Sequence, residues 1–300
     1  MKPAIAVFGS INMDIAVPVA ALPRPGETVL GGDARLSLGG KGANQGVAAS
    51  RLGASVMMIG CVGADVFGAA ARTALVQEGI DLAHVTTQAD VATGVALITV
   101  DARGQNCISV SPGANMLLSA ADAESAVDSI RRSAVLLVQN EVSALASLCA
   151  ARIARAAGVL VIADPAPALG YDLALLAEVD FLTPNETEAQ QLTSITVQDQ
   201  ASAMAAAHHL VMRGARNVLI KLGAQGVVYC GAAGEGHVLA PRVQAIDTVA
   251  AGDCFNGALA VALAEGIGLP EALAFACRAA AIAVTRSGAA RSMPFRHEMG

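Results

Sequence analysis

The chain has 300 residues, of which 54% are hydrophobic and 15% are charged. It is therefore long and apolar enough to bury a substantial core, and it does not have the composition of a disordered chain. Its net charge is −6 and no cluster of Lys or Arg stands out, which argues against a surface that binds nucleic-acid phosphates.

The first apolar run, "AIAVFGS" at 4–10, is too short for the core of a signal peptide and reads as a buried strand. Later apolar runs are interrupted by Asp, Glu or Arg before they reach the roughly 18 residues that a membrane span needs. The six cysteines include no CxxC pair, and most fall within apolar runs. We expect a cytoplasmic protein with reduced cysteines and no membrane contact.

Short β-rich runs alternate with Ala-rich helical stretches, the pattern of βαβ units around a largely parallel sheet. The β-rich runs are almost continuously apolar, which indicates burial on both faces of the sheet. The expected strands are 4–9, 55–60, 134–139, 159–163, 180–183 and 217–222; the expected helices are 43–52, 67–78, 143–157, 186–192, 199–213, 252–265 and 270–285. Glycines that would end helices follow five of them, at Gly53, Gly79, Gly158, Gly214 and Gly266. The predicted class is α/β with a mostly parallel central sheet.

Two regions break this alternation. Residues 14–38 are rich in Pro and Gly with short alternating strands, and residues 93–110 read as a hairpin whose turn lies near Asp101–Gln105. Both are antiparallel in character and should lie outside the parallel layer. They are either decoration at an edge of the sheet or a lid over the carboxyl ends of the main strands, where open α/β sheets bind ligands.

Polar side chains follow two of the expected strands. The segment "SINMD" places Asn12 and Asp14 on one face of extended chain, where an amide and a carboxylate suit recognition of adjacent sugar hydroxyls. A simple Asx turn is the alternative. Glu141 follows the strand 134–139 and either faces a ligand or is an ordinary glutamate in the first turn of a helix.

The segment "GGKGANQG" at 39–46 surrounds a lysine with glycines and then enters a helix. Its glycines would let the backbone approach a ligand closely, and Lys41 and Asn44 could hydrogen-bond polyol hydroxyls next to Gly40. The alternative is a strand-to-helix turn with a solvated lysine.

Standard nucleotide signatures are missing, since the sequence has neither GxGxxG after the first strand nor a Walker motif. In "TPNETEA", Asn185 and Glu188 have the spacing of a capping box, or they hold hydrated Mg²⁺ and phosphate oxygens. In "KLGAQG", Gly223 and Gly226 form either a hairpin turn or a loop that approaches phosphates.

The segment "DTVAAGDCFNG" at 247–257 carries the strongest candidate for catalysis. Ala250, Ala251 and Gly252 would leave backbone amides free at a helix start, where their dipoles stabilise a phosphoryl group in transfer. Asp253 in the first helical turn would accept the proton of an attacking hydroxyl. The alternative is an acid that only compensates the helix dipole.

Together, "GSINMD", "PRPGETV", "GGKGANQGVAASRLGA", "DPAPA", "TPNETEA" and "DTVAAGDCFNGAL" resemble the ribokinase-type sugar kinases, in that family's order and from about residue 4 to residue 295. The resemblance implies one kinase domain over residues 1–300: a Rossmann-like three-layer α/β fold whose β-sheet lid comes from about 14–38 and 93–110. It also implies MgATP-dependent phosphorylation of O5 of D-ribose, a monovalent cation such as K⁺ as activator, and a homodimer formed through the lids.

The site residues implied by the resemblance fall into four groups. Asp253 matches the general base, and Ala250, Ala251 and Gly252 match the anion hole. The sugar contacts match Asn12, Asp14, Gly40, Lys41, Asn44, Glu141 and Asp253. The ATP contacts match Asn185, Lys221, Gly223, Gly226, Gly252 and Cys277, with Glu188 linked to Mg²⁺ through water. The K⁺ site matches Asp247, Val249, Ala283, Arg286, Gly288 and Ser292.

Two positions depart from the family pattern. Lys221 stands where a small hydroxyl residue is common, and Cys277 where a polar neighbour of adenine is common. Lys221 either adds a phosphate contact or is solvated. Rival functions are a deoxyribokinase, an adenosine or pseudouridine kinase, or a non-catalytic sugar or nucleotide sensor. The absence of aromatic residues from the lid disfavours an adenine substrate, and a sensor has no need of Asp253 as a base.

Overall fold

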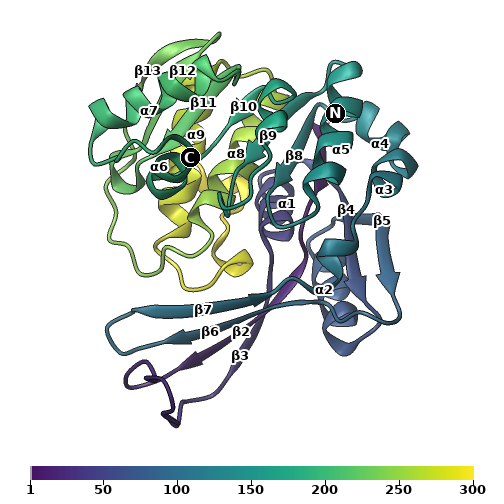
Figure 1. Ribbon diagram of the computed structural model, residues 1–300, viewed down its shortest axis with the longest axis vertical. Helices are drawn as coiled ribbons and strands as arrows, with labels where there is room; N and C mark the ends of the chain where they lie inside the picture. Colours follow the sequence, from purple (N-terminus) through teal and green to yellow (C-terminus); the bar gives the residue numbers. More distant parts are fainter. Residues whose placement is uncertain (1) are drawn as a thin grey trace.

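The computed structural model describes residues 2–300, and its centre is a large twisted sheet (Figure 1). Within the described residues this sheet has nine strands in the order β13-β12-β11-β10-β9-β8-β1-β4-β5. The strands from β11 to β5 are parallel to one another, and the pairs β11–β12 and β12–β13 are antiparallel, so that only β12 runs against the others. Their bounds are β1 Ala4–Phe8, β4 Ser55–Gly63, β5 Asp81–Gln88, β8 Val135–Gln139, β9 Leu160–Asp164, β10 Phe181–Leu182, β11 Asn217–Lys221, β12 Val227–Gly231 and β13 Gly234–Val238.

Helices cover both faces of this sheet because successive side chains of its strands point to opposite sides. Ile5 and Val7 of β1 belong to one hydrophobic core, and Ala6 and Phe8 belong to the other. The first core is closed by α1 Lys41–Arg51, α2 Val66–Gln77, α8 Ala251–Ala264 and α9 Leu269–Ala283. The second is closed by α3 Ala120–Ser125, α4 Val127–Arg131, α5 Ala144–Ala156, α6 Glu186–Thr193 and α7 Gln200–Met212.

The six strands and seven helices expected from the sequence are present, with ends that shift by a few residues at most. The five glycines that follow helices all have φ between 74° and 109°, the left-handed conformation expected of residues that end helices. Strands β5, β12 and β13 and helices α3 and α4 were not anticipated. β5 reads "DLAHVTTQ" and β13 reads "GEGHV", so neither edge strand has the continuous apolar pattern of the strands inside the sheet.

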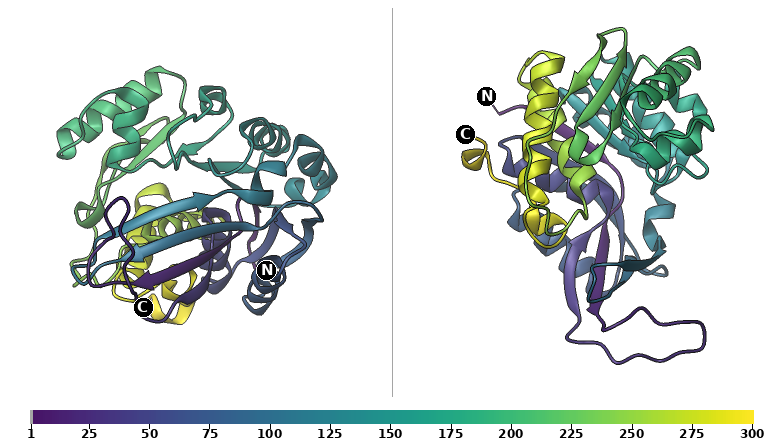
Figure 2. Two further views of the ribbon diagram at one scale, coloured as in Figure 1. Left: turned by 60° about the horizontal axis from the view of Figure 1, so that its bottom comes forward. Right: turned by 90° about the vertical axis from the view of Figure 1, so that its left-hand side faces the viewer.

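A second sheet projects from the carboxyl ends of the central strands (Figures 1 and 2). Its order is β3-β2-β6-β7, formed by β2 Asn12–Pro18, β3 Arg35–Gly39, β6 Gly94–Val100 and β7 Asn106–Ser111. The outer pairs are antiparallel, as each region alone indicated, but β2 and β6 are parallel where the two regions meet. A hydrogen bond of 2.8 Å from the amide of Asp101 to the carbonyl of Gln105 closes the expected hairpin turn. The predicted class, a mostly parallel α/β layer with a small separate sheet, is confirmed.

Short connections join the two sheets. β1 ends at Phe8 and β2 begins at Asn12, while β3 ends at Gly39 and α1 begins at Lys41. The polar segments at 10–14 and 39–46 therefore lie where the second sheet meets the carboxyl ends of the parallel strands, which is where such sheets bind ligands. None of the helices in residues 2–300 is long and apolar enough to cross a membrane.

Candidate active site at the carboxyl ends of the central strands

Asp253 lies in the first turn of α8 and is 4% exposed. The amide nitrogen of Asn44 donates to its Oδ2 at 3.0 Å, and that of Gln45 donates to its Oδ1 at 3.1 Å. Both amides come from α1, which packs directly against α8. That packing requires a small residue at Gly257, where a Cβ atom would lie 2.6 Å from the carbonyl of Gln45. Asp253 is therefore a buried carboxylate held from a second helix, unlike a solvated acid that only compensates a helix dipole.

The surroundings of Asp253 raise the pKa of its carboxyl toward neutrality. Burial raises the pKa of its carboxyl from 3.8 to about 6, and the negative charge of Asp164 adds to that rise. The ammonium of Lys41 and the two amide donors act in the opposite direction. A carboxylate with this pKa can take a proton from a hydroxyl and release it again.

The chain enters α8 through Ala250, which has a left-handed backbone with φ 58° and ψ 15°. The amide of Ala251 donates to the carbonyl of Thr248 at 3.3 Å, so it closes the turn. The amides of Ala250 and Gly252 donate no hydrogen bond to any acceptor among residues 2–300. The expectation of three free amides is therefore corrected to two, which together with the helix dipole favour an anion.

The turn from β3 into α1 brings the predicted sugar-binding residues together. Gly40 has φ 87°, and a Cβ atom there would lie 2.8 Å from the amide nitrogen of Asn12. The amide of Lys41 donates to Oε2 of Glu141 at 3.1 Å, and the hydroxyl of Ser10 donates to the same oxygen at 2.6 Å. Only a glycine at position 40 allows the backbone of this turn to lie so close to the backbone of Asn12. The seven predicted residues therefore lie close together: charge interactions connect Asp14, Lys41, Glu141 and Asp253, Asn44 donates to Asp253, and Gly40 lies against Asn12.

Charge in this pocket is concentrated around Lys41. Burial alone would lower the pKa of the ammonium, but nearby carboxylates outweigh it and raise the pKa. In decreasing order of effect, these carboxylates belong to Asp253, Asp164, Glu141 and Glu188. Burial and the charges of Glu141 and Asp253 raise the pKa of Asp14 to about 6. Lys41 is therefore the positive centre of an acidic cluster, and the alternative of a solvated lysine fails.

A cavity of about 450 Å³ opens beside Asn12 and Glu141. Asn115 fixes its floor, since its side chain accepts from the amide of Ile11 at 2.8 Å and donates to Oδ1 of Asn12 at 2.7 Å. Much of the remaining lining is apolar: Val110, Pro112, Met116, Val142, Pro167 and Leu169. The cavity therefore combines polar lining, which includes Glu141 of the acidic cluster, with apolar lining.

Lys221 lies between two acidic residues at the ends of β9 and α6. Its Nζ is 3.3 Å from Oδ1 of Asp164, and only 13% of its side chain is exposed. A Cβ atom on Gly252 would lie 3.2 Å from the same ammonium, so Lys221 reaches the start of α8. It is therefore neither solvated nor remote from the two free amides.

Asn185 and Glu188 form the predicted capping box of α6. The side chain of Asn185 accepts from the amide of Glu188 at 2.8 Å, and Oε2 of Glu188 accepts from the amide of Asn185 at 2.8 Å. Burial and the charge of Asp164 raise the pKa of Glu188, and Lys221 opposes this rise. Glu188 therefore caps α6, and its carboxylate also belongs to the acidic cluster around Lys41.

The segment from Gly223 to Gly226 is the turn of a hairpin, because β11 and β12 pair antiparallel on either side of it. This turn begins directly after Lys221. Cys277 lies in α9, and burial raises the pKa of its thiol to about 11. The structure itself assigns no ligand to these residues.

The residues expected to hold K⁺ gather at a junction of two segments. The amide of Asp247 donates to the carbonyl of Val284 at 3.2 Å, and Oδ2 of Asp247 accepts from the amide of Gly288 at 2.9 Å. Oδ1 of Asp247 accepts from the amide of Val249 at 3.0 Å. Arg286 instead pairs with Glu298, and the hydroxyl of Ser292 donates to the carbonyl of Ala289 at 2.8 Å. Ala283 lies in the last turn of α9.

Two residues of this site were missed from the sequence. The amide of Gln45 donates at 3.1 Å both to Oδ1 of Asp253 and to Oδ2 of Asp164, and its own oxygen accepts from Gln139 at 2.9 Å. Asp164 is the last residue of a buried strand, a position similar to the one that identified Glu141. Gln45 lies inside "GGKGANQG", but nothing in that segment shows that its side chain bridges two carboxylates.

The whole chain is similar to known carbohydrate kinases. It is 43% identical to the ribokinase of Haemophilus influenzae, over 99% of this chain and 97% of that protein. It is 35% identical to the deoxyribokinase of Salmonella typhi, over 97% and 95% respectively. The structure of Arabidopsis thaliana ribokinase complexed with ribose and ATP superposes with a TM-score of 0.91 at 32% identity, over 100% of this chain and 98% of that one. The family model of the pfkB family carbohydrate kinases matches residues 2–296, and the chain belongs to that family.

Proposed function

We propose that this kinase is an ATP-dependent ribokinase, which transfers the γ-phosphoryl group of ATP to O5 of D-ribose and forms ribose 5-phosphate. The observation that carries the proposal is the buried carboxylate of Asp253 beside two free amides at the start of α8. Its full-length relatives named as ribokinases support ribose as the acceptor, and the superposed ribokinase with ribose and ATP supports the donor.

In this reaction Asp253 takes the proton of the attacking hydroxyl. A pKa of about 6 leaves the group ionised at neutral pH but basic enough to accept a proton in the transition state. The amides of Ala250 and Gly252 stabilise the charge on the phosphoryl oxygens, because they point from a helix start and are fixed before the reaction. Ala251 acts indirectly, since its amide closes the turn that presents the other two.

D-Ribose binds between Lys41 and the residues at the start of β2. Oδ1 of Asn44 is buried and has no hydrogen-bond partner among the described residues, so it can accept from a sugar hydroxyl. The carboxylates of Asp14 and Glu141 accept from further hydroxyls, and Lys41 donates to sugar oxygens. Asn12 and Gly40 complete the set.

ATP lies along the edge formed by Lys221, the 223–226 turn and α9. Lys221 and the amide of Gly252 contact its phosphates, while Asn185 and Cys277 lie along the remainder of the nucleotide. Hard oxygen ligands suit Mg²⁺, and Glu188 and Asp164 supply two carboxylates whose charges disfavour each other without a cation. Mg²⁺ bound through water to Glu188 would neutralise phosphate charge during transfer.

A K⁺ ion fits the junction of residues 247–249 and 283–292, mainly through backbone carbonyls. Asp247 already ties the two segments together, so a cation there would order the loop that leads to Ala250. Activity with K⁺ should exceed activity with Na⁺ at equal ionic strength. Equal rates with both ions would remove the cation from the proposal.

Association through the second sheet fits its exposed apolar residues. Leu36, Leu97, Ile108 and Val110 are each about half exposed, at 48%, 55%, 47% and 53%. Strand pairing places Leu36 and Leu97 on one face of this sheet and Ile108 and Val110 on the other, and exposed apolar surface of this kind is typical of a protein interface. A homodimer in which the lids cover each other would bury it. The cytoplasmic location remains a prediction.

The apolar lining of the cavity favours a second candidate, a kinase for nucleosides or for deoxyribose. Met116, Val142 and Leu169 offer a surface that ribose alone does not need. A panel of ribose, deoxyribose, fructose, adenosine and pseudouridine, assayed with MgATP and K⁺, separates these functions by their kcat/KM. Ribose should give the highest value. A higher value for another acceptor would reassign the substrate, and binding without turnover of any acceptor would favour a sensor.

A further inference from the structure

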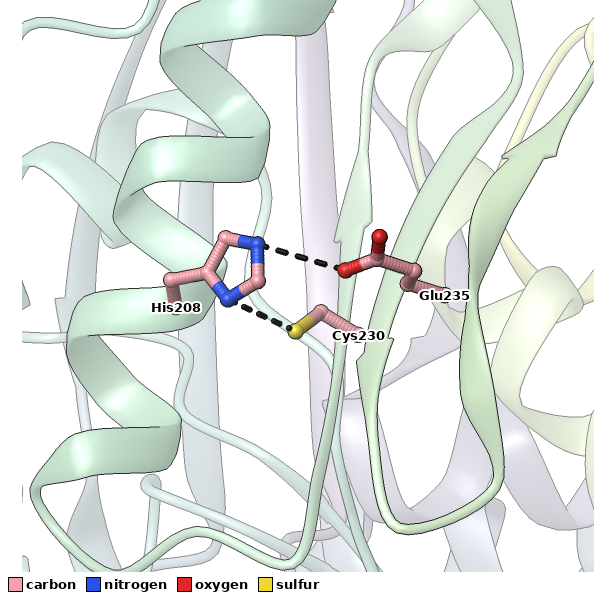
Figure 3. Close-up of side chains that lie close together, drawn as sticks. All are labelled: His208, Cys230 and Glu235. Atoms are coloured by element: carbon pink, nitrogen blue, oxygen red, sulfur yellow. Dashed lines mark hydrogen bonds and ion pairs between the residues drawn. The ribbon is translucent and has the colours of Figure 1, made fainter.

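Three side chains with metal-binding atoms converge on the face of the sheet that α7 covers (Figure 3). His208 comes from α7, Cys230 from β12 and Glu235 from β13. Sγ of Cys230 lies 3.3 Å from Nδ1 of His208, and Nε2 of the same ring lies 3.3 Å from Oε2 of Glu235. One ligand atom from each residue can be chosen so that all three lie within 4.8 Å of one another.

This cluster is a product of the strand register. Cys230 and Glu235 are direct partners across the antiparallel β12–β13 pair, so their side chains share one face. His208 projects onto that face from α7. Cys230 also pairs with Val218, at the amino end of β11, whereas Lys221 and the candidate active site lie at its carboxyl end. The cluster therefore lies near the amino end of β11, and the acidic cluster lies near its carboxyl end.

The donor set selects one class of metal ion. A thiolate, an imidazole nitrogen and a carboxylate oxygen are the ligands of zinc-type sites, which in tetrahedral geometry are separated by roughly 3.3–3.7 Å. The separation between Sγ of Cys230 and Nδ1 of His208 is already 3.3 Å, whereas the 3.3 Å contact of Glu235 is to the other ring nitrogen, so one of the two side chains must turn to share an ion. His208 and Glu235 have side chains that are 51% and 63% exposed, so both can rotate toward a common ion while the buried thiol stays in place.

We propose that His208, Cys230 and Glu235 form a binding site for one thiophilic divalent cation of the zinc class, with water as the fourth ligand. Binding displaces the proton of the Cys230 thiol and leaves the imidazole neutral. The ion links α7 to both strands of the outer hairpin, so it stabilises this edge of the sheet. Mg²⁺, which takes oxygen ligands, does not compete for the site.

Titration of the full-length protein with Co²⁺ in excess Mg²⁺ tests the site, because thiolate bound to Co²⁺ gives a charge-transfer band in the near ultraviolet. One equivalent should produce the band, and Zn²⁺ should abolish it and raise Tm. His208→Gln and Glu235→Gln should each weaken binding at least about tenfold, since even residues that only support ligands contribute that much. Cys230→Ser should remove the band.

Matched controls lie close by. His209→Gln changes the next residue of α7, and Cys107→Ser removes the exposed thiol of β7. Neither should alter the Co²⁺ band. A band that survives Cys230→Ser, or that is lost with Cys107→Ser, would overturn the proposal, as would unchanged affinity in both His208→Gln and Glu235→Gln. Because the two exposed variants leave the core intact, misfolding cannot account for their result. Kinase activity with MgATP should be the same in all five variants, so the outcome is independent of the proposed function.

Discussion

The ammonium of Lys221 and the carboxylate of Asp164 form a nearly buried ion pair of 3.3 Å. Lys221 ends β11 and Asp164 ends β9, so both groups lie at the carboxyl ends of central strands. Asp164 is held on its other oxygen by Gln45, so the pair is connected to Asp253 through a single amide. A buried charge that loses its partner is strongly destabilised. Lys221 therefore also supplies the counter-charge for the buried carboxylate of Asp164 beside the candidate phosphate site.

Replacing Lys221 should weaken the binding of nucleotide. In Lys221→Met, we expect KM for MgATP to rise about tenfold, the equivalent of one charge-assisted hydrogen bond, while KM for ribose changes little. Lys221→Arg keeps the charge and should retain most of the affinity. Steady-state kinetics with each substrate varied in turn measure both constants. An unchanged KM for MgATP in the Met variant would leave Lys221 with a purely structural role.

Replacing Asp253 should separate binding from chemistry. Asp253→Asn keeps the shape of the side chain but removes the base, so kcat should fall by roughly 10²–10⁴-fold. Ribose should still bind, with a dissociation constant measured by calorimetry that stays within a few-fold of the wild-type value. Asp199→Asn is a suitable control, because Asp199 caps α7 on the surface and Asn caps helices equally well. Retained kcat in Asp253→Asn would rule out the base function.

Activity should depend on pH through the same carboxyl group. Because only ionised Asp253 can accept a proton, kcat/KM should fall as the pH drops below about 6. The nearby carboxyl of Asp14 titrates in the same range and should steepen the fall. A pH profile of kcat/KM between pH 4.5 and 8 tests this. A profile that is flat down to pH 5 would contradict a raised pKa.

Stability should show the opposite trend with pH. The pKa of Asp253 in the folded chain, about 6, lies above its unfolded value near 4, so the folded state binds more protons between these values. Its contribution to the free energy of unfolding therefore decreases by about 2–3 kcal/mol as the pH rises from 4 to above 6. Asn has no proton to exchange. The difference in Tm between Asp253→Asn and wild type should be more positive at pH 8 than at pH 5.

Gln45 should act as a positioning residue. Gln45→Met preserves volume but removes the donor to Asp253, which helps to hold its pKa down. We expect kcat to fall by about tenfold with little change in KM for ribose, and the acid limb of the pH profile to move to higher pH. Gln77→Met on the exposed end of α2 should change neither quantity. A loss of activity without any movement of the limb would indicate a structural role only.

Association through the second sheet can be tested at its exposed face. Leu97→Glu should convert a dimer into monomers, because a charge would be buried in the interface. Light scattering coupled to size-exclusion chromatography measures the mass. Leu145→Glu on α5 changes a leucine that is 73% exposed elsewhere and serves as the control. A wild-type mass equal to one chain would contradict the dimer, and a Leu97→Glu dimer would move it to another surface.

Most of the fold follows from local patterns in the sequence. Buried parallel strands such as "VLLVQ" of β8 are continuous apolar runs, and helix ends are marked by glycine, so both could be identified. The exposed edge strands β5 and β13 could not be identified, because β5 carries polar residues and β13 carries polar residues and glycines. Their position comes from pairing with strands whose apolar residues fix the register.

The residues of the candidate site could also be predicted only in part. Asp253, Lys41 and Glu141 were identified because each follows a strand or begins a helix in a distinctive segment. The bridge through Gln45 was not, since it depends on how α1 packs against α8 and on the space left by Gly257. The group of His208, Cys230 and Glu235 likewise exists only because α7 lies on the β12–β13 hairpin.

The three residues between β1 and β2 are a short connection between the central sheet and the second sheet. Phe8 lies in the central sheet and Asn12 begins the second sheet. Between them, the side chain of Asn115 accepts from the amide of Ile11 and donates to its carbonyl. We therefore expect residues 9–11 to act as a pivot for movement between the two sheets. Any rotation of the second sheet about this pivot carries Asn12 and Asp14 away from Asp253, so opening the site to release product also dismantles the contacts that hold a sugar.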